Sequence, residues 1–260
     1  MANTNTDKIK HIVAVMSGKG GTGKSVITSL LAVSLQSLGH RVGILDGDLT
    51  NPTIRYLFGV KCELSLSDAG GIEPLRSSRG VEMMSMDLFL EDENTPLGWQ
   101  GPMISSALKQ FYKDTEWGQL DYLLIDLSPC SSDTTLTVLQ SFPLDGVIIV
   151  ASPQIVVTKG VKKCINLVHQ LNGTIIGVVE NMVHFETPKG ERYAVYGPSC
   201  GDELVAMADA PLLGQFPFDT KLTALCDAGR IEEYHTRACD TLATNFLMCL
   251  KDERQPQQMQ

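Results

Sequence analysis

The sequence predicts an α/β protein in which helices cover both faces of a mostly parallel central sheet. Two observations predict this class. Short runs rich in Val, Ile and Leu alternate along the chain with longer amphipathic stretches, and most of these runs are apolar throughout. Such runs are typical of strands buried on both faces, and their alternation with helices favours parallel pairing.

The individual elements follow from the same alternation. The expected strands are His11–Met16, Val42–Leu45, Val81–Met86, Tyr122–Ile125, Val147–Ala151, Thr174–Val179 and Leu212–Gln215. The expected helices are Lys24–Leu38, Gly101–Lys113, Ser132–Gln140, Val156–Gln170 and Cys200–Ala208. Residues 61–80, 87–100 and 182–198 fit the alternation poorly, and we expect long loops there.

The spacing and composition also limit the domain organisation and the partners. No obvious linker interrupts the alternation, so we expect one domain over residues 1–260, with flexible tails at residues 1–9 and 251–260. The net charge is −9 and no run is rich in Lys and Arg, so nucleic acid is not an expected partner.

The expected location is the cytoplasm. The first residues lack the apolar stretch of a signal peptide, and no apolar run is long enough to cross a bilayer, so neither secretion nor membrane insertion is expected. The 7 cysteines contain no C-x-x-C pair, and an odd number favours reduced thiols over a disulfide framework.

A glycine-rich loop at residues 18–25 is the strongest functional signal. Its sequence GKGGTGKS matches G-x-x-x-x-G-K-[ST], the motif of a phosphate-binding P-loop, and it lies between an expected strand and an expected helix. We therefore expect a P-loop NTPase that binds and hydrolyses ATP. The alternative, a glycine-rich turn before a helix, requires neither the lysine nor the serine that ends the motif.

The residue types in the loop suit this chemistry. The loop contains four glycines, Gly18, Gly20, Gly21 and Gly23. Because they lack side chains, several backbone N–H groups can approach one phosphate chain. Lys24 is expected on the β- and γ-phosphates and Ser25 on a Mg²⁺ ion, while the amides of Thr22 and Val26 complete the cradle.

Carboxylates at the ends of two expected strands suit a magnesium site. Asp126 ends the run beginning at Tyr122, as in a Walker-B strand, and is the expected second Mg²⁺ ligand. Asp46 and Asp48 follow the second strand, at the edge of the sheet where ligands collect. Either could orient the attacking water; the alternative is that both cap the following turn in solvent.

The loop resembles the deviant Walker A motif of the family that includes MinD, ParA and the nitrogenase iron protein, because it carries an additional lysine, Lys19. In that family the additional lysine reaches across a dimer interface to the nucleotide of the partner. The resemblance therefore implies a homodimer in which Lys19 acts like an arginine finger. The alternative is a solvent-exposed lysine at the tip of a loop.

Within that superfamily, the chain resembles the Mrp branch, whose ATPases carry iron–sulfur clusters to apoproteins. The resemblance covers about residues 10–235 and includes the segments LDGD, WQGPM, WGQLDY, IDLSP, SPQ and GVVENM. It implies that Asn181 contacts the adenine and that Pro217, Phe218 and Asp219 line the base pocket. It also implies a client protein in metallocofactor assembly.

The sequence departs from the Mrp branch at the cluster motif. Mrp carriers have a C-P-x-C pair after the Glu-Asn-Met strand, whereas this chain has Thr187 at the first cysteine and lacks the second. Thr and Lys cannot replace thiolates as cluster ligands, so carriage by the usual site is not expected. Cys130 and Cys200 are the alternative candidates for cluster ligands; otherwise they are structural or merely reactive thiols.

Three functions remain in competition. The first is an Mrp-like ATPase that acts in metallocofactor assembly with its cluster site lost or relocated, and this is the function we expect. The second is a positioning ATPase of the MinD/ParA kind, which would favour an amphipathic membrane helix or a basic face. The third is a redox ATPase that resembles the nitrogenase iron protein. For the ATPase we expect slow turnover, because no potent general base is evident.

Overall fold

The computed structural model describes residues 5–48, 51–61, 65–67, 70–85, 88, 101–130 and 132–252. Its central feature is an eight-stranded sheet in the order β10-β7-β6-β1-β5-β2-β4-β3. The strands are β1 (Ile9–Ser17), β2 (Val42–Gly47), β3 (Leu75–Arg76), β4 (Glu82–Met84), β5 (Leu120–Leu127), β6 (Gly146–Ala151), β7 (Ile175–Glu180) and β10 (Leu212–Gln215). Among these strands only β3, at one edge, is antiparallel to its neighbour, so the expected mostly parallel sheet is confirmed.

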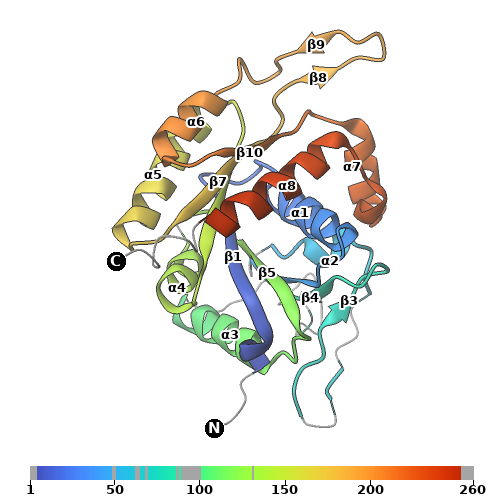
Figure 1. The fold of residues 1–260 in the computed structure, drawn as a ribbon, viewed down its shortest axis with the longest axis vertical. Helices are drawn as coiled ribbons and strands as arrows, with labels where there is room; N and C mark the ends of the chain where they lie inside the picture. Colours follow the sequence, from blue (N-terminus) through green and yellow to red (C-terminus); the bar gives the residue numbers. More distant parts are fainter. Residues whose placement is uncertain are drawn as a thin grey trace.

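Helices cover both faces of the sheet (Figure 1). On one face lie α1 (Lys24–Ser37), α2 (Ile54–Leu57), α7 (Thr220–Asp227) and α8 (Arg237–Asp252), with a 3₁₀ turn at Ile231–Glu233. On the other face lie α3 (Gly101–Asp114), α4 (Asp133–Ser141), α5 (Ile155–Gln170) and α6 (Gly201–Ala208). Each face has its own apolar core, because side chains of successive strand residues point to opposite faces.

The carboxyl ends of β1 and β5 create a crevice in this arrangement. The two strands are parallel neighbours, with Val15 paired to Asp126. The chain leaves β1 into α1 on one face of the sheet and leaves β5 toward α4 on the opposite face. Open α/β sheets bind ligands at such a point of divergence. The fold therefore places the glycine-rich loop and Asp126 side by side.

All the expected strands and helices are present, with ends that shift by a few residues. The expected strand at Val81–Met86 is shorter, and Met86 lies outside the described residues. Three helices that we did not predict, α2, α7 and α8, complete one face. Within the expected loop at residues 61–80, the chain forms the short edge strand β3. Of the expected loop at residues 87–100, only Leu88 is described.

Parts of the two expected tails have regular secondary structure. Residues Asn5–Lys8 form a 3₁₀ turn that contacts α3, where Thr6 bonds to Tyr112, and Ile9 already pairs with Leu120 in the sheet. At the other end, α8 continues to Asp252. Residues 1–4 and 253–260 lie outside the described residues.

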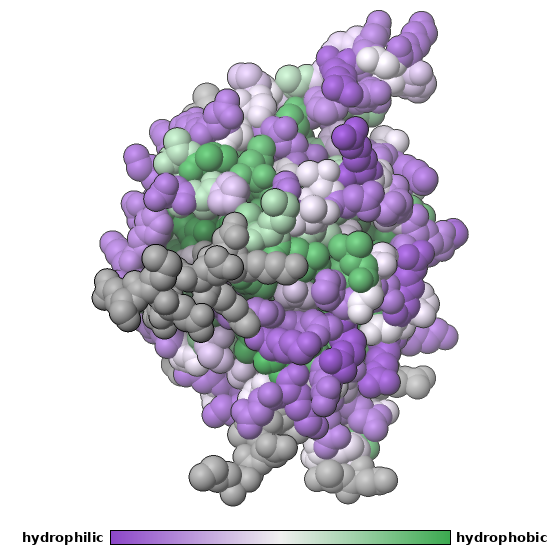
Figure 2. All heavy atoms as spheres, viewed as in Figure 1, coloured by the Kyte–Doolittle hydropathy of each residue, from purple (hydrophilic) through white to green (hydrophobic). Residues whose placement is uncertain are grey.

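The segment at residues 184–198, here called the arm, stands apart from the sheet. It contains a two-stranded hairpin of β8 (Phe185–Glu186) and β9 (Arg192–Tyr193) rather than an open loop. Figures 1 and 2 show that the hairpin projects from the body of the molecule with a largely hydrophilic surface. Most of its residues are exposed.

None of the helices in the described part of the chain combines the length and the apolar character needed to span a bilayer.

Candidate functional site

The glycine-rich loop connects β1 to α1 and has an unusual backbone. Gly21 and Gly23 have φ angles of +82° and +81°, in the left-handed region that L side chains rarely adopt. A Cβ atom added at Gly20 or Gly21 would meet no heavy atom within 4 Å among the described residues, so this part of the loop faces open space. The backbone amides of this segment are therefore accessible to a ligand as large as a phosphate chain.

Two further glycines allow close packing against the rest of the protein. A Cβ atom at Gly18 would lie 2.3 Å from the backbone carbon of Gly160 on α5. A Cβ atom at Gly23 would lie 2.3 Å from Nδ2 of Asn181. Neither distance is possible for real atoms. At Gly18 the neighbour is backbone, and at Gly23 the φ angle of +81° adds strain for any side chain, so both places favour glycine.

Lys24, Ser25 and Asp126 meet at the start of α1. The Nζ atom of Lys24 lies 2.6 Å from Oδ2 of Asp126, and Ser25 Oγ donates to the same oxygen at 2.6 Å. Thr28 Oγ1 donates to the other carboxylate oxygen at 2.8 Å. Asp126 is completely buried, so the Lys24 ammonium compensates a charge that water cannot reach.

These side chains fit a hydrated Mg²⁺ ion and a polyphosphate. Ser25 and Asp126 supply the hard oxygen ligands that Mg²⁺ prefers, and they lie side by side. Lys24 is only 7% exposed, yet its ammonium lies in the same cluster. The buried hydroxyl of Thr22 has no hydrogen-bond partner among the described residues, which suits a loop that is completed by a ligand.

Asp46 lies beside Asp126, because the two residues are register partners on β2 and β5. Its carboxylate accepts hydrogen bonds from the backbone N–H groups of Asp48, Thr53 and Ile54 at 3.1, 2.9 and 3.0 Å. Burial, followed by the charge of Asp126, raises the pKa of Asp46 from 3.8 to about 8. A protonated Asp46 is a weak candidate for orienting water. Its hydrogen bonds instead stabilise the turn after β2.

Asp48 lies at the mouth of the crevice. Its Oδ1 atom accepts a hydrogen bond of 3.0 Å from Ser128, which follows β5. A hollow of about 230 Å³ opens here, lined by Ser17, Gly20, Gly21, Thr22, Gly23, Lys24, Ser25, Val26, Asp48, Asn51, Thr53 and Pro129. The structure therefore brings Asp48 to the same hollow as the phosphate loop. Lys19 is exposed at the tip of the loop, and its carbonyl accepts a hydrogen bond from Ser17.

A second hollow, of about 150 Å³, adjoins the loop on the side of α7. It is lined by Gly23, Val26, Asn181, Met182, Pro217, Phe218, Asp219, Leu222, Thr223 and Cys226. Asn181 donates to the carbonyl of Thr22 at 2.9 Å and so connects β7 to the loop. Asp219 accepts hydrogen bonds from Lys221 N–H and Tyr234 OH, which hold it at the start of α7. The residues expected around a base thus lie together.

The two candidate cysteine ligands lie apart in different surroundings. Cys130 follows β5, and the nearby Cys164 thiol on α5 lowers the pKa of Cys130. Cys200 precedes α6 and donates its backbone N–H to Glu180 at 2.6 Å. Among the described residues, no group of three or more His, Cys, Asp or Glu side chains could hold a metal ion. Thr187 lies on the arm, in a turn closed by Gly190 N–H.

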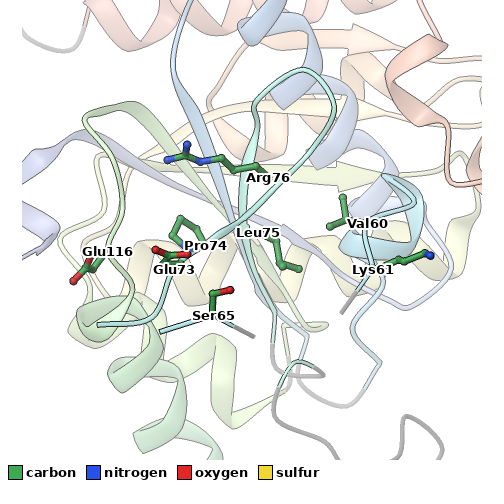
Figure 3. Close-up of a pocket in the computed structure, with 8 residues that line it drawn as sticks. All are labelled: Val60, Lys61, Ser65, Glu73, Pro74, Leu75, Arg76 and Glu116. Atoms are coloured by element: carbon green, nitrogen blue, oxygen red, sulfur yellow. The ribbon is translucent and has the colours of Figure 1, made fainter. Parts of the chain in front are cut away.

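A larger hollow of about 590 Å³ lies at the β3 edge of the sheet. Figure 3 shows its charged side chains, and Lys61 and Arg76 point in different directions. Arg76 is paired with Glu82 at 3.1 Å, while Glu116 accepts a hydrogen bond from Ser67. Because its charges do not converge on one point, we place the functional site at the glycine-rich loop instead.

Several residues that contribute to the site were not predicted from the sequence. Ser128 donates a hydrogen bond to Asp48, and Thr28 donates one to Asp126. Gly160 packs against the backbone of Gly18. A signal existed for Thr28, which follows Lys24 by one helical turn and so shares its face of α1. No local signal marks Gly160, because its contact depends on how α5 packs.

Glu180 is a further residue that we did not predict. Burial opposes its ionisation, but bonds from Ser199, the Cys200 N–H and Gln215 hold the pKa of Glu180 below its usual value. Glu180 precedes Asn181, so these bonds hold the chain between the hollow that Asn181 lines and the arm.

Known proteins resemble the chain over most of its length. An iron–sulfur cluster carrier protein from Clostridium perfringens is 40% identical over 238 residues, which cover 89% of this chain and 84% of that protein. A nucleotide-binding protein from Archaeoglobus fulgidus, solved in complex with ADP, is 40% identical with a TM-score of 0.79, covering 89% of this chain and 91% of that one. The septum site-determining protein MinD from Pyrococcus horikoshii, solved with Mg-ADP, has a TM-score of 0.62 but 20% identity, covering 94% of this chain and 96% of that one, and shares the fold alone.

The family model for the ParA group described as NUBPL iron-transfer P-loop NTPase matches residues 8–248. This range includes the glycine-rich loop, both hollows beside it and the arm. The model and the 40% identical relatives agree with the Mrp resemblance seen in the sequence. The chain belongs to the family of Mrp-type iron-transfer P-loop NTPases.

Proposed function

We propose that the protein is a Mg-ATP-dependent, slowly hydrolysing and homodimeric ATPase that acts in metallocofactor assembly. The observation that carries the proposal is the meeting of Lys24, Ser25 and Asp126 beneath a loop whose glycines admit a phosphate chain. The names of the relatives, iron–sulfur cluster carrier and assembly proteins, support the role in metallocofactor assembly. A protein client in the cytoplasm is the proposed partner, without nucleic acid or membrane.

The proposed residue roles follow from the positions of the side chains. Lys24 exchanges its contact with Asp126 for the β- and γ-phosphates, while Gly18 to Val26 supply backbone N–H groups. Ser25 and Asp126 hold Mg²⁺, which neutralises phosphate charge when it is bound. Asn181, Pro217 and Asp219 hold the base. These roles use the two hollows that adjoin the loop.

Slow hydrolysis follows from the two carboxylates that come after β2, Asp46 and Asp48. Asp48 is the proposed residue that orients water, but its Oδ1 atom accepts a hydrogen bond from Ser128. Asp46 has its pKa raised to about 8 by burial and by the charge of Asp126, which keeps it largely protonated at neutral pH. A protonated carboxyl accepts no proton, so Asp46 is not a strong general base.

Dimerisation is proposed because Lys19 is exposed at the tip of the loop, where its side chain can extend toward a second copy. A cation supplied by the partner subunit would stabilise the charge that develops on the transferred phosphoryl group. The site of each chain is then complete only in the dimer.

The cluster site is the part of the function that we propose has changed. The arm carries Thr187, Pro188, Lys189 and Gly190 where Mrp carriers have C-P-x-C. The hydroxyl of Thr187 and Gly190, which has no side chain, cannot replace two thiolates. We therefore propose that the protein acts as a scaffold, carrier or regulator without a cluster at the usual position.

The test combines hydrolysis with iron content. Protein purified without oxygen is assayed for phosphate release with Mg-ATP, and its iron and acid-labile sulfide are measured. The proposal expects slow Mg-dependent phosphate release and no stoichiometric cluster. In the double variant Thr187→Cys and Gly190→Cys, it expects the gain of iron and sulfide after anaerobic reconstitution. No phosphate release, or a full cluster in the unchanged protein, would contradict the proposal.

A further inference from the structure

Two thiols lie together beside the phosphate loop, and none of the proposed roles uses them. Cys130 follows β5, and Cys164 lies on α5. The Cys130 N–H donates to the carbonyl of Ser17, and the adjacent Gly18 packs on Gly160, one helical turn before Cys164, so the two cysteines lie near each other. Cys164 is completely buried, whereas Cys130 is partly exposed and packs against the same apolar core. Solvent thus reaches part of Cys130 but none of Cys164.

We propose that Cys130 and Cys164 are an oxidation site, where a hydroperoxide converts the two thiols into a disulfide that reversibly slows the nucleotide chemistry. The disulfide itself depends only on the geometry of the thiol pair. Its effect on hydrolysis rests on the proposed function.

The environment gives the two thiols different parts in this reaction. The hydrogen bond from Cys164, opposed by partial burial and aided by the charge of Lys163, lowers the pKa of Cys130 to about 7. The same hydrogen bond, together with burial, raises the pKa of Cys164. Because the thiolate is the nucleophile, Cys130 reacts with the oxidant and Cys164 resolves the product.

The chemistry balances with the hydroperoxide as a two-electron oxidant. The Cys130 thiolate attacks a peroxide oxygen, the O–O bond breaks, and Cys130 becomes a sulfenic acid while the leaving oxygen takes a proton. The Cys164 sulfur then attacks the sulfenic sulfur and the S–O bond breaks. The thiol proton of Cys164 leaves with that hydroxide as water, so each sulfur has lost one electron.

The disulfide would act on the loop because both cysteines are connected to it. The backbone N–H of Cys130 donates to the carbonyl of Ser17 at 3.2 Å, and Pro129 lines the phosphate hollow. On the other side, Gly160 of α5 packs directly against Gly18. An S–S bond of about 2.05 Å is shorter than any non-bonded contact between two sulfur atoms, so forming it must move Cys130, Cys164 or both. Such a movement would displace Pro129, which adjoins Cys130 and lines the phosphate hollow.

The test begins with reduced, full-length protein that is treated briefly with hydrogen peroxide. Remaining thiols are blocked with N-ethylmaleimide, and the protein is digested without reductant for mass spectrometry. The proposal expects a linked pair of peptides containing Cys130 and Cys164, lighter by two hydrogen atoms and separated by dithiothreitol. It also expects Mg-ATP hydrolysis at least about tenfold slower after oxidation, with recovery on reduction.

Three variants control for other thiols and for folding. Cys164→Ala removes the resolving sulfur with little change in volume, so Cys130 should stop at a sulfenic acid that dimedone traps. Cys130→Ser should give no linked peptide. Cys249→Ser, which changes another partly exposed cysteine on α8, should leave the linkage intact. Circular dichroism confirms that each variant is folded.

The outcomes separate this inference from the proposed function. Absence of the linked peptides in the oxidised wild type would overturn the inference, even if hydrolysis is present. Linked peptides with unchanged hydrolysis would overturn the proposed effect on the loop. Linked peptides in a protein that never hydrolyses ATP would support the oxidation site and contradict the ATPase proposal instead.

Discussion

The phosphate loop and the arm are both connections that follow a strand of the sheet, yet they are built in opposite ways. In the loop, Gly18 packs so closely on the backbone of Gly160 that no Cβ atom would fit, and Lys24 is paired with a buried carboxylate. In the arm, most residues are exposed, and Arg192 and Glu186 form an ion pair in solvent. The loop is constrained by contacts from several strands and helices, whereas the arm is held mainly at its base.

This difference shows which part of an iron-transfer NTPase can change with little loss of stability. A substitution in the loop must respect buried charge and close backbone packing, so its effect extends to stability. A substitution in the arm beyond its base removes mainly exposed contacts. We propose that an arm without a C-P-x-C pair is compatible with an unchanged nucleotide site. The predictions below test this contrast, from the largest expected effect to the smallest.

Lys24→Ala should abolish both nucleotide binding and hydrolysis. It should also lower the free energy of unfolding by about 3–5 kcal/mol, because Asp126 is completely buried and loses its cation. Urea denaturation and phosphate release measure the two effects. Lys10→Ala is the matched control, since the Lys10–Asp121 pair is also on β1 and β5 but Lys10 is 64% exposed; it should cost at most about 1 kcal/mol. Equal costs for the two variants would contradict the contrast.

Lys19→Ala should preserve nucleotide affinity but reduce hydrolysis by at least about a hundredfold, as expected for a cation supplied across a dimer. It should also weaken ATP-dependent dimerisation, measured by light scattering. Because Lys19 is exposed, the free energy of unfolding should remain the same. Unchanged phosphate release in this variant would show that the lysine is only a solvent-exposed side chain.

Asp46→Asn should change how stability depends on pH. Burial and the charge of Asp126 raise the pKa of Asp46 from 3.8 to about 8, so the folded protein keeps a proton that the unfolded chain releases above pH 3.8. This contribution to stability is complete below that pH, declines as the pH rises, and is lost above about 8. Denaturation at several pH values between these limits should show a steeper decline in the wild type than in the variant; identical slopes would contradict the assignment.

Tyr193→Ala, in the arm, should have the smallest effect. The side chain is 53% exposed, so the free energy of unfolding should change by less than about 0.5 kcal/mol and Mg-ATP affinity should stay constant. Phe216→Ala, on the apolar core behind β10, is the contrasting variant: at 1% exposure it should cost about 3–5 kcal/mol. A large loss of stability from Tyr193→Ala would show that the arm is held more firmly than its exposure indicates.

The sequence predicted the sheet, most helices and the phosphate loop because these depend on local patterns. The loop motif joins a strand to a helix within a few residues, and Asp126 ends a recognisable apolar run. The positions of Asn181 and Asp219 beside the loop came from the family resemblance, not from any local pattern.

What remained unpredicted depends on contacts between distant segments. The bond from Ser128 to Asp48 and the packing of Gly160 on Gly18 arise only when β5, β2 and α5 assemble. The pairing of Cys130 with Cys164 has the same origin. α8 was missed although its buried residues Leu242, Phe246 and Leu250 recur at helical spacing, so a signal for that helix was present.

The most direct test of the nucleotide site is calorimetric titration of the unmodified protein with Mg-ATP and Mg-ADP. Because the loop offers open backbone amides above a lysine, a hydroxyl and a carboxylate, we predict saturable heat that depends on Mg²⁺ for ATP. Absence of any heat of binding at millimolar nucleotide, with folded protein, would contradict the assignment of the glycine-rich loop as a phosphate site.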